Sequence, residues 1–224
     1  MRLAIFDLDN TLLAGDSDHL WGQYLVRHGV VDPEVYAREN DRFYREYQAG
    51  TLDIHEYAAF SLQPLVRHGV EGLLALRARF VAEEIAPIVA PGTPALLEKH
   101  RAQGDRLLIT TATGRFVTEP IAELLGVETL IATDPEIIEG RYTGRIAGTP
   151  NFQAGKVHKL RDWLGATGTG DWERTFYSDS RNDLPLLEQA HRAVAVDPDE
   201  VLRAEALRRG WPIISLREPP TDAA

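Results

Sequence analysis

The stretch Met1-Arg2-Leu3-Ala4-Ile5-Phe6-Asp7-Leu8-Asp9-Asn10-Thr11-Leu12 decides how this chain is organised. Residues 3–6 form an apolar run that predicts a buried strand, and two aspartates separated by one residue follow it directly. Because strand side chains alternate with period two, Asp7 and Asp9 are expected to project together from the carboxyl end of this strand. Their mutual repulsion is costly without a cation, so the stretch predicts a metal site that carries a nucleophile.

The composition is that of an ordinary globular protein. The chain has 224 residues, of which 44% are hydrophobic and 26% charged, which suffices for one core domain with a smaller inserted one. Its net charge of -10, without a basic run interleaved with aromatics, argues against a nucleic-acid partner. The absence of cysteine excludes disulfides and thiolate metal sites. We find neither a secretory leader nor an apolar run of membrane-spanning length, so we expect a cytoplasmic protein without a membrane partner.

Helix signals dominate residues 16–88. Capping residues, apolar residues at helical spacing and closing glycines predict a succession of helices without an intervening strand. The predicted helices begin near Asp16, Asp32, Asp53 and Glu71 and end near Gly29, Gly50, Gly69 and Ala86, with a bend expected at Pro64. We therefore interpret 16–88 as an all-α cap inserted into a core formed by 1–15 and 89–224.

Strands and helices alternate in the rest of the chain. The predicted strands are 107–110, 129–132, 175–177, 193–196 and 211–215, with a hairpin over 137–146 that turns at Glu139-Gly140. The predicted helices are 93–104, 116–125, 151–164, 201–209 and one from Leu184, and the glycine run 165–170 is expected to be a flexible loop. This order predicts an α/β fold, a Rossmann-like three-layer core with a mostly parallel sheet plus the inserted cap.

Chemically capable residues recur where these elements begin or end. They are Asp7 and Asp9, Thr111, Lys156 at the head of a helix, and the segment 179–183. Open α/β sheets bind ligands beyond the carboxyl ends of their strands, so these residues are expected to converge although the sequence separates them widely. Two acidic segments, a hydroxyl and a lysine are a consistent set for handling phosphate together with Mg²⁺.

In this order the motifs resemble those of the haloacid dehalogenase superfamily of phosphohydrolases. Asp7-Leu8-Asp9-Asn10-Thr11-Leu12 and Ser178-Asp179-Ser180-Arg181-Asn182-Asp183 match its first and fourth motifs, and the helical insertion is similar to the cap of its phosphoserine-phosphatase-like branch. Thr111 and Lys156 match the second and third motifs, although Thr110 or Thr113 could replace Thr111, and Lys159 could replace Lys156. The resemblance covers essentially the whole chain.

The resemblance implies a role for each matched residue. Asp7 would be the nucleophile that becomes an aspartyl phosphate, and Asp9 would be the general acid and base. Thr111, the loop amide at Ala112 and Lys156 would bind the phosphoryl oxygens. Mg²⁺ would be held by Asp7, the backbone carbonyl of Asp9 and Asp179, with Asn182 and Asp183 holding metal waters or orienting Lys156.

The substrate is expected to be a small soluble phosphate ester. Phosphoserine is the leading candidate by resemblance, and histidinol phosphate is its rival because Asp16 suits either amine. Asp16 could instead be only the N-cap of the first cap helix. His19 and Arg115 are further substrate candidates, whereas no cap arginine can be singled out among Arg67, Arg77 and Arg79.

Two readings from other classes compete with an enzyme. A receiver-type signalling module also gathers acids, a hydroxyl and a lysine, but it would place its phospho-acceptor on a later strand and lack a helical insertion. A non-catalytic phosphate-binding protein with a relic site is the second alternative, although every motif position is filled.

Overall fold

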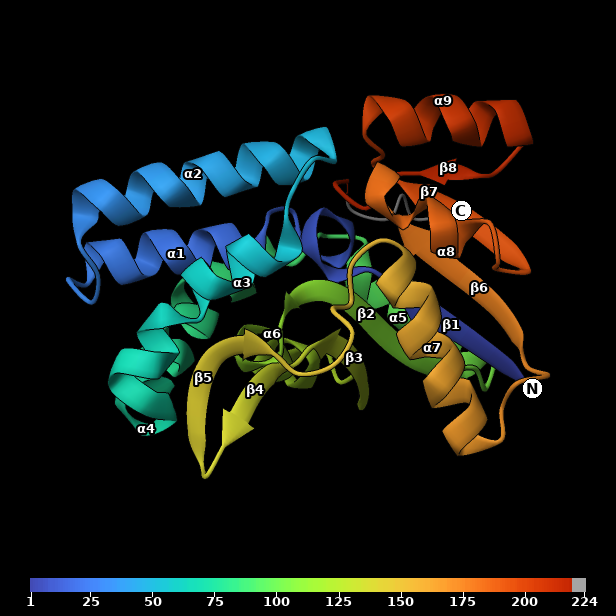
Figure 1. The fold of residues 1–224 in the computed structure, drawn as a ribbon. Helices are drawn as coiled ribbons and strands as arrows, with labels where there is room; N and C mark the ends of the chain where they lie inside the picture. Colours follow the sequence, from blue (N-terminus) through green and yellow to red (C-terminus); the bar gives the residue numbers. More distant parts are fainter. Residues whose placement is uncertain (219–224) are drawn as a thin grey trace.

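A single parallel sheet forms the centre of the molecule. The computed structural model describes residues 1–218. Its six-stranded sheet has the order β3-β2-β1-β6-β7-β8, and all neighbouring strands are parallel (Figure 1). The strands are β1 (Arg2–Phe6), β2 (Arg106–Gly114), β3 (Thr129–Thr133), β6 (Glu173–Ser178), β7 (Arg192–Val196) and β8 (Ile213–Ile214). The N-terminal strand thus lies in the middle of the sheet, between β2 and β6.

Helices cover both faces of this sheet, which confirms the three-layer α/β prediction. Ala4 and Phe6 share one apolar cluster with residues of α5 (Thr93–Ala102) and α6 (Arg115–Leu124). Leu3 and Ile5 point to the opposite face, where they share a second cluster with α7 (Ala154–Thr167), α8 (Leu184–Leu187) and α9 (Glu200–Arg209). The period-two alternation of β1 therefore divides the core into two clusters.

Residues 17–88 contain helices joined by short loops, without a strand. They form α1 (Ser17–Arg27), α2 (Pro33–Ala49), α3 (Ile54–Ser61) and α4 (Gln63–Phe80), followed by the short turns η2 (Val81–Ile85) and η3 (Ala86–Ile88). As expected, Gly50 ends α2 in a left-handed conformation. The chain bends at Leu62, two residues before Pro64, and again at Gly69, which interrupts α4 with φ 66° and ψ 173°.

Two adjacent backbone segments, near Leu13 and Val89, connect this helical part to the sheet. Leu13 pairs with Val89 in an isolated antiparallel bridge. The Ala14 amide donates to the Ile88 carbonyl at 2.6 Å, and the Ala90 amide donates to the Leu12 carbonyl at 3.0 Å. The hairpin of β4 (Pro135–Ile138) and β5 (Arg141–Ile146) also lies against the helices, since β5 contacts α3 and α4 (Figure 1).

Several expected boundaries are wrong. The strand predicted to stop at Thr110 runs on to Gly114, because Gly114 still pairs with Thr133 after an irregularity in the register. The helix predicted from Asn151 begins at Ala154, since Asn151 is buried in the preceding loop. The glycine run is not all loop: α7 continues to Thr167 and ends at Gly168, whose φ of 67° favours glycine.

None of the helices within residues 1–218 has the length and apolar character needed to cross a membrane. The end of the predicted core, 219–224, lies outside the described residues.

Candidate active site

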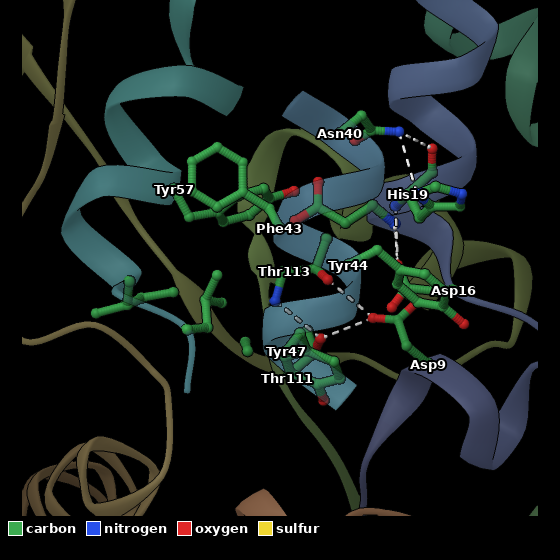
Figure 2. Close-up of a pocket in the computed structure, with 14 residues that line it drawn as sticks. Asp9, Asp16, His19, Asn40, Phe43, Tyr44, Tyr47, Tyr57, Thr111 and Thr113 are labelled. Carbon is green, nitrogen blue, oxygen red and sulfur yellow. Dashed lines mark hydrogen bonds between the residues drawn. The ribbon is translucent and has the colours of Figure 1, made fainter. Parts of the chain in front are cut away.

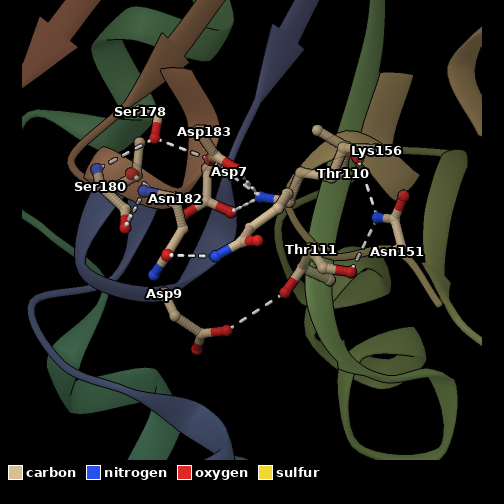
Figure 3. A network of polar contacts seen from close by, with 12 residues as sticks. Asp7, Asp9, Thr110, Thr111, Asn151, Lys156, Ser178, Ser180, Asn182 and Asp183 are labelled. Atoms are coloured by element: carbon tan, nitrogen blue, oxygen red, sulfur yellow. Dashed lines mark hydrogen bonds and ion pairs between the residues drawn. The ribbon is translucent and has the colours of Figure 1, made fainter. Parts of the chain in front are cut away.

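The first acidic motif lies in a tight turn rather than on a strand. β1 ends at Phe6, and the chain then turns through Leu8–Leu12 (η1), where Asp9 keeps an extended backbone (φ -71°, ψ 131°) and Asn10 adopts φ 57°. Both acids lie on extended backbone, but the two carboxylates have different hydrogen-bond partners (Figure 3). Both side chains are buried.

Lys156 lies at the centre of the site. Its Nζ donates to Asp7 Oδ1 at 2.7 Å and to Asp183 Oδ2 at 2.8 Å, and all three side chains are buried (Figure 3). Burial lowers the pKa of Lys156, but the charges of Asp183 and Asp7 outweigh it and hold that pKa above its ordinary value. Burial raises the pKa of Asp7 to about 7, although Lys156 lowers it. The lysine is therefore a fixed cation beside the expected nucleophile.

Asp179 joins this group through Thr11. The Thr11 hydroxyl lies 3.0 Å from Asp179 Oδ1 and 3.3 Å from Asp7 Oδ2, and the backbone amide of Asp179 donates to the same hydroxyl at 3.0 Å. Burial, followed by the charge of Asp7, raises the pKa of Asp179 well above its ordinary value. Two carboxylates thus repel one another at the carboxyl ends of β1 and β6, where a divalent cation would offset their charge.

Asp9 is held by α1 and by the end of β2. It accepts hydrogen bonds from the Ser17 amide at 2.6 Å and from the hydroxyls of Thr111 and Thr113 at 3.2 and 2.8 Å. Both threonines therefore face the site. The sequence had left Thr113 as an alternative to Thr111, and the structure brings both hydroxyls to Asp9. Thr110 does not face it, because its hydroxyl accepts a hydrogen bond from Asn151 Nδ2 at 3.0 Å.

Asn151 is a residue that motif reasoning missed. Its Nδ2 also donates to the carbonyls of Thr111 and Ile131 at 2.8 and 2.9 Å, so it ties the ends of β2 and β3 together. It is fully buried. Because its amide supports the backbone at Thr111, Asn151 fixes the strand end from which that hydroxyl projects (Figure 3). The sequence carries no local signal for this role, because Pro150 is as compatible with the start of a helix as with a loop.

Two basic candidates lie elsewhere. Arg115 Nε donates to Asp134 Oδ1 at 2.6 Å, and Lys159 Nζ donates to Asp134 Oδ2 at 2.6 Å. Neither side chain is brought to Asp7, so the structure favours Lys156 over Lys159 and does not support Arg115 as a substrate residue. The charge of Arg115 is paired instead with the carboxylate of Asp134, 19 residues along the chain.

Asn182 connects the sheet to the helical part. Its Nδ2 donates to the carbonyl of Tyr47 near the end of α2 at 3.0 Å, and its Oδ1 accepts from Gln153 Nε2 at 3.2 Å. It forms no hydrogen bond with Lys156, which Asp183 orients instead. Ser178 supports Asp183 by donating to its Oδ2 at 2.8 Å. Asp183 therefore orients Lys156, whereas Asn182 connects the sheet to the helical part.

A pocket opens directly above Asp9 between the sheet and the helices. It contains about 490 Å³ of empty space, its open mouth included. Aromatic and acidic side chains form much of its wall, and Thr111, Ala112 and Thr113 form its floor (Figure 2). The lining residues are Asp9, Asp16, Asp18, His19, Asn40, Phe43, Tyr44, Tyr47, Leu52, Ile54, Tyr57, Thr111, Ala112 and Thr113.

Asp16 and His19 both reach this pocket. Asp16 is the N-cap of α1, with Oδ1 accepting from the amides of Asp18 and His19 at 3.0 and 2.8 Å, and it also lines the pocket. The two alternatives for Asp16 are thus compatible. The ring of His19 stacks on Tyr44 at 4.4 Å, and burial lowers the pKa of His19.

None of the three cap arginines lines the pocket. Arg77 donates to the Phe116 carbonyl at 2.7 Å, Arg79 pairs with Glu83 at 3.4 Å, and Arg67 is exposed on α4.

Comparison with known proteins places this arrangement in a family. The model of the haloacid dehalogenase-like hydrolases matches residues 4–188, and the chain belongs to this family. A histidinol-phosphatase of Neisseria meningitidis is 43% identical over 96% of this chain and 99% of its own length. A protein of unknown function from Bordetella pertussis has the same fold, with a TM-score of 0.90 and 45% identity over 96% of this chain and 98% of its own.

More distant solved structures share the fold. A substrate-bound phosphoserine phosphatase has a TM-score of 0.69 with 16% identity, and it covers 97% of this chain and 93% of its own. At that identity the likeness concerns the fold alone. The expected family and fold are thus confirmed.

Proposed function

We propose that this chain is a Mg²⁺-dependent phosphomonoesterase that hydrolyses a small phosphorylated metabolite through an aspartyl phosphate on Asp7. The observation that carries the proposal is the buried contact of Lys156 with Asp7 at 2.7 Å, two residues along the chain from Asp9, which lines a pocket together with Thr111. A fixed cation beside a carboxylate nucleophile offsets charge on a phosphoryl group, and phosphoryl transfer depends on such positioning.

Each residue then has a chemical task. A carboxylate oxygen of Asp7 attacks phosphorus, the bond from phosphorus to the ester oxygen breaks, and Asp9 transfers a proton to the departing alkoxide. Asp9 next removes a proton from water, which attacks the aspartyl phosphate and releases inorganic phosphate. Thr113 and Thr111 keep the carboxylate of Asp9 over the reacting group through their hydroxyls.

The oxygen donors fit a magnesium ion. Asp7 and Asp179 provide carboxylates, and the Asp9 carbonyl is the third protein donor in the proposal. Within residues 1–218 no three acidic or histidine side chains gather into a complete cage. This suits Mg²⁺, which keeps several waters and binds through one or two carboxylates together with phosphate oxygens. When bound, Mg²⁺ would neutralise charge between nucleophile and phosphate.

The pocket wall favours an amine without a carboxylate. No lysine or arginine is among the residues that line it, whereas Asp16 and Asp18 are. Phosphoserine needs a cation for its carboxylate, and histidinol phosphate does not. The charge of the pocket, together with the similarity to a histidinol-phosphatase, therefore supports histidinol phosphate over phosphoserine, which motif resemblance had placed first.

The division into domains is part of the proposal. Residues 16–88 would be the cap, and 1–15 with 89–224 the core. The pocket lies between them, because its wall comes from α1, α2 and α3 and its floor from β2. Closure of the cap would exclude bulk water until the second chemical step.

Phosphate release from a panel of phosphate esters tests the function. The panel contains p-nitrophenyl phosphate, phosphoserine and histidinol phosphate, each assayed with Mg²⁺ and after chelation. We expect activity that requires Mg²⁺, is highest with histidinol phosphate and is abolished in Asp7→Asn. Substantial turnover by Asp7→Asn would remove Asp7 as nucleophile, and no release from any ester would support a receiver-like or relic protein.

A further inference from the structure

The wall that the pocket shares with a smaller cavity combines an acid with an aromatic ring. Asp18, in the first turn of α1, and Tyr57, on α3, line both the main pocket and a smaller cavity that Asp9 and Asp16 do not reach. In the close-up, Tyr57 and Asp16 lie on opposite sides of the pocket (Figure 2). The smaller cavity is walled largely by apolar residues, including Leu62 and Ile146. Asp18 therefore lies where the two cavities adjoin.

Asp16 and Asp18 give the wall of the pocket two acidic side chains. Within residues 1–218, neither Asp16 nor Asp18 forms an ion pair with lysine, arginine or histidine. By contrast, Asp134 is paired with two cations at 2.6 Å although its side chain is 34% exposed. Burial raises the pKa of Asp18 to about 7 against a lowering contribution from the Tyr57 hydroxyl. A cationic ligand would supply the missing charge.

The rings around the acid suit a flat cation. The rings of Phe43 and Tyr57 meet edge to face, with their centroids 5.2 Å apart, and both residues line the pocket. Aromatic faces attract cations most strongly where water is excluded, and they also stack on flat rings. A flexible aliphatic amine would use only the charge, whereas a protonated heteroaromatic ring would use the charge and the faces together.

We propose that Asp18 and Tyr57 form a specificity subsite for a second, heteroaromatic cation of the substrate, distinct from the aliphatic ammonium that Asp16 faces. The proposal rests on the function proposed above and adds which residues recognise the ring of an ester that carries two cationic groups. Asp18 then determines specificity without touching the reacting phosphoryl group.

The variant Asp18→Asn tests this subsite, because it removes the charge and keeps the shape. We expect kcat/KM for histidinol phosphate to fall about 10- to 100-fold, mainly through KM, as for the loss of a hydrogen bond between charged groups. Turnover of p-nitrophenyl phosphate, which has no cation, should stay within about twofold, and that of phosphoethanolamine, which has one, within about threefold. Tyr57→Phe should lower kcat/KM for histidinol phosphate less than Asp18→Asn does.

Asp171→Asn is the matched control, since Asp171 is exposed in the loop before β6. An equal loss for histidinol phosphate and p-nitrophenyl phosphate in Asp18→Asn would overturn the subsite, as would unchanged kinetics with histidinol phosphate. If the wild type hydrolyses neither ester, the proposed function fails, and calorimetric binding of histidinol itself then decides on the subsite. Equal affinity of histidinol for wild type and Asp18→Asn would refute it.

Discussion

Replacing Lys156 by methionine should separate the catalytic role of this residue from its structural one. Lys156 Nζ contacts Asp7 at 2.7 Å and Asp183 at 2.8 Å, and its side chain is only 2% exposed. Methionine preserves much of the buried volume but leaves two carboxylates close together without a cation. Breaking a buried ion pair on one side costs about 3 to 5 kcal/mol of stability, because an uncompensated charge stays buried.

Activity should fall further than stability alone explains. Removing one preorganised charge donor from an active site typically lowers kcat about 10²- to 10³-fold. We expect a loss of at least that size in p-nitrophenyl phosphate hydrolysis at saturating Mg²⁺, measured below the melting temperature of the variant. The double variant Lys156→Met with Asp183→Asn removes one of the two stranded charges, so it should regain about half of the lost stability without regaining activity.

Lys159→Met provides the matched control. Lys159 is on the same helix and also forms an ion pair, with Asp134 at 2.6 Å, but its side chain is 18% exposed. It should therefore lose no more than about 1 kcal/mol and keep its activity within about threefold. If Lys156→Met retains more than a tenth of wild-type turnover, or if Lys159→Met is equally inactive, the assignment of Lys156 is wrong.

Further predictions concern pH and positioning. Burial raises the pKa of Asp18 from 3.8 in its ordinary state to about 7, so its ionisation opposes folding; the stability gained by Asp18→Asn over wild type should grow from pH 4 to pH 7 and then level off, measured by chemical denaturation. Arg217 donates to the carbonyls of Asn10 and Leu13 at 2.8 and 2.9 Å; Arg217→Ala should lower kcat about tenfold by loosening the turn that carries the acid motif, and an unchanged kcat would contradict this role. Arg115→Gln should leave KM for histidinol phosphate unchanged within about twofold, since its partner lies outside the pocket, and a large rise in KM would return Arg115 to the substrate site.

Much of the fold could be predicted from local patterns. The apolar run of β1, the caps Asp16 and Asp32, and the closing Gly50 are read over a few residues, because capping and side-chain alternation act at short range. Boundaries went wrong where a distant partner intervenes. β2 continues to Gly114 because β3 lies beside it, which no pattern within residues 106–114 reveals.

The residues of the site also fall into those that a local pattern reveals and those that it does not. The motifs containing Asp7 and Asp179 stand out in the sequence, because acids directly after buried strands are unusual and a chemical reason for them exists. The sequence left Thr111 and Thr113, or Lys156 and Lys159, as alternatives. Each member of such a pair has the same local context, and only its neighbours in space distinguish it.

The sequence by itself determined the family, the parallel α/β class, the helical insertion and the acids that carry the chemistry. Only the tertiary structure decided that Lys156 meets Asp7 across 149 residues of sequence, that Arg115 is paired elsewhere, and that Asp18 faces Tyr57 in a pocket without a lysine or arginine. The physical reason is that charge balance and burial depend on distances through space. Crossovers between parallel strands bring together residues that share no local signal.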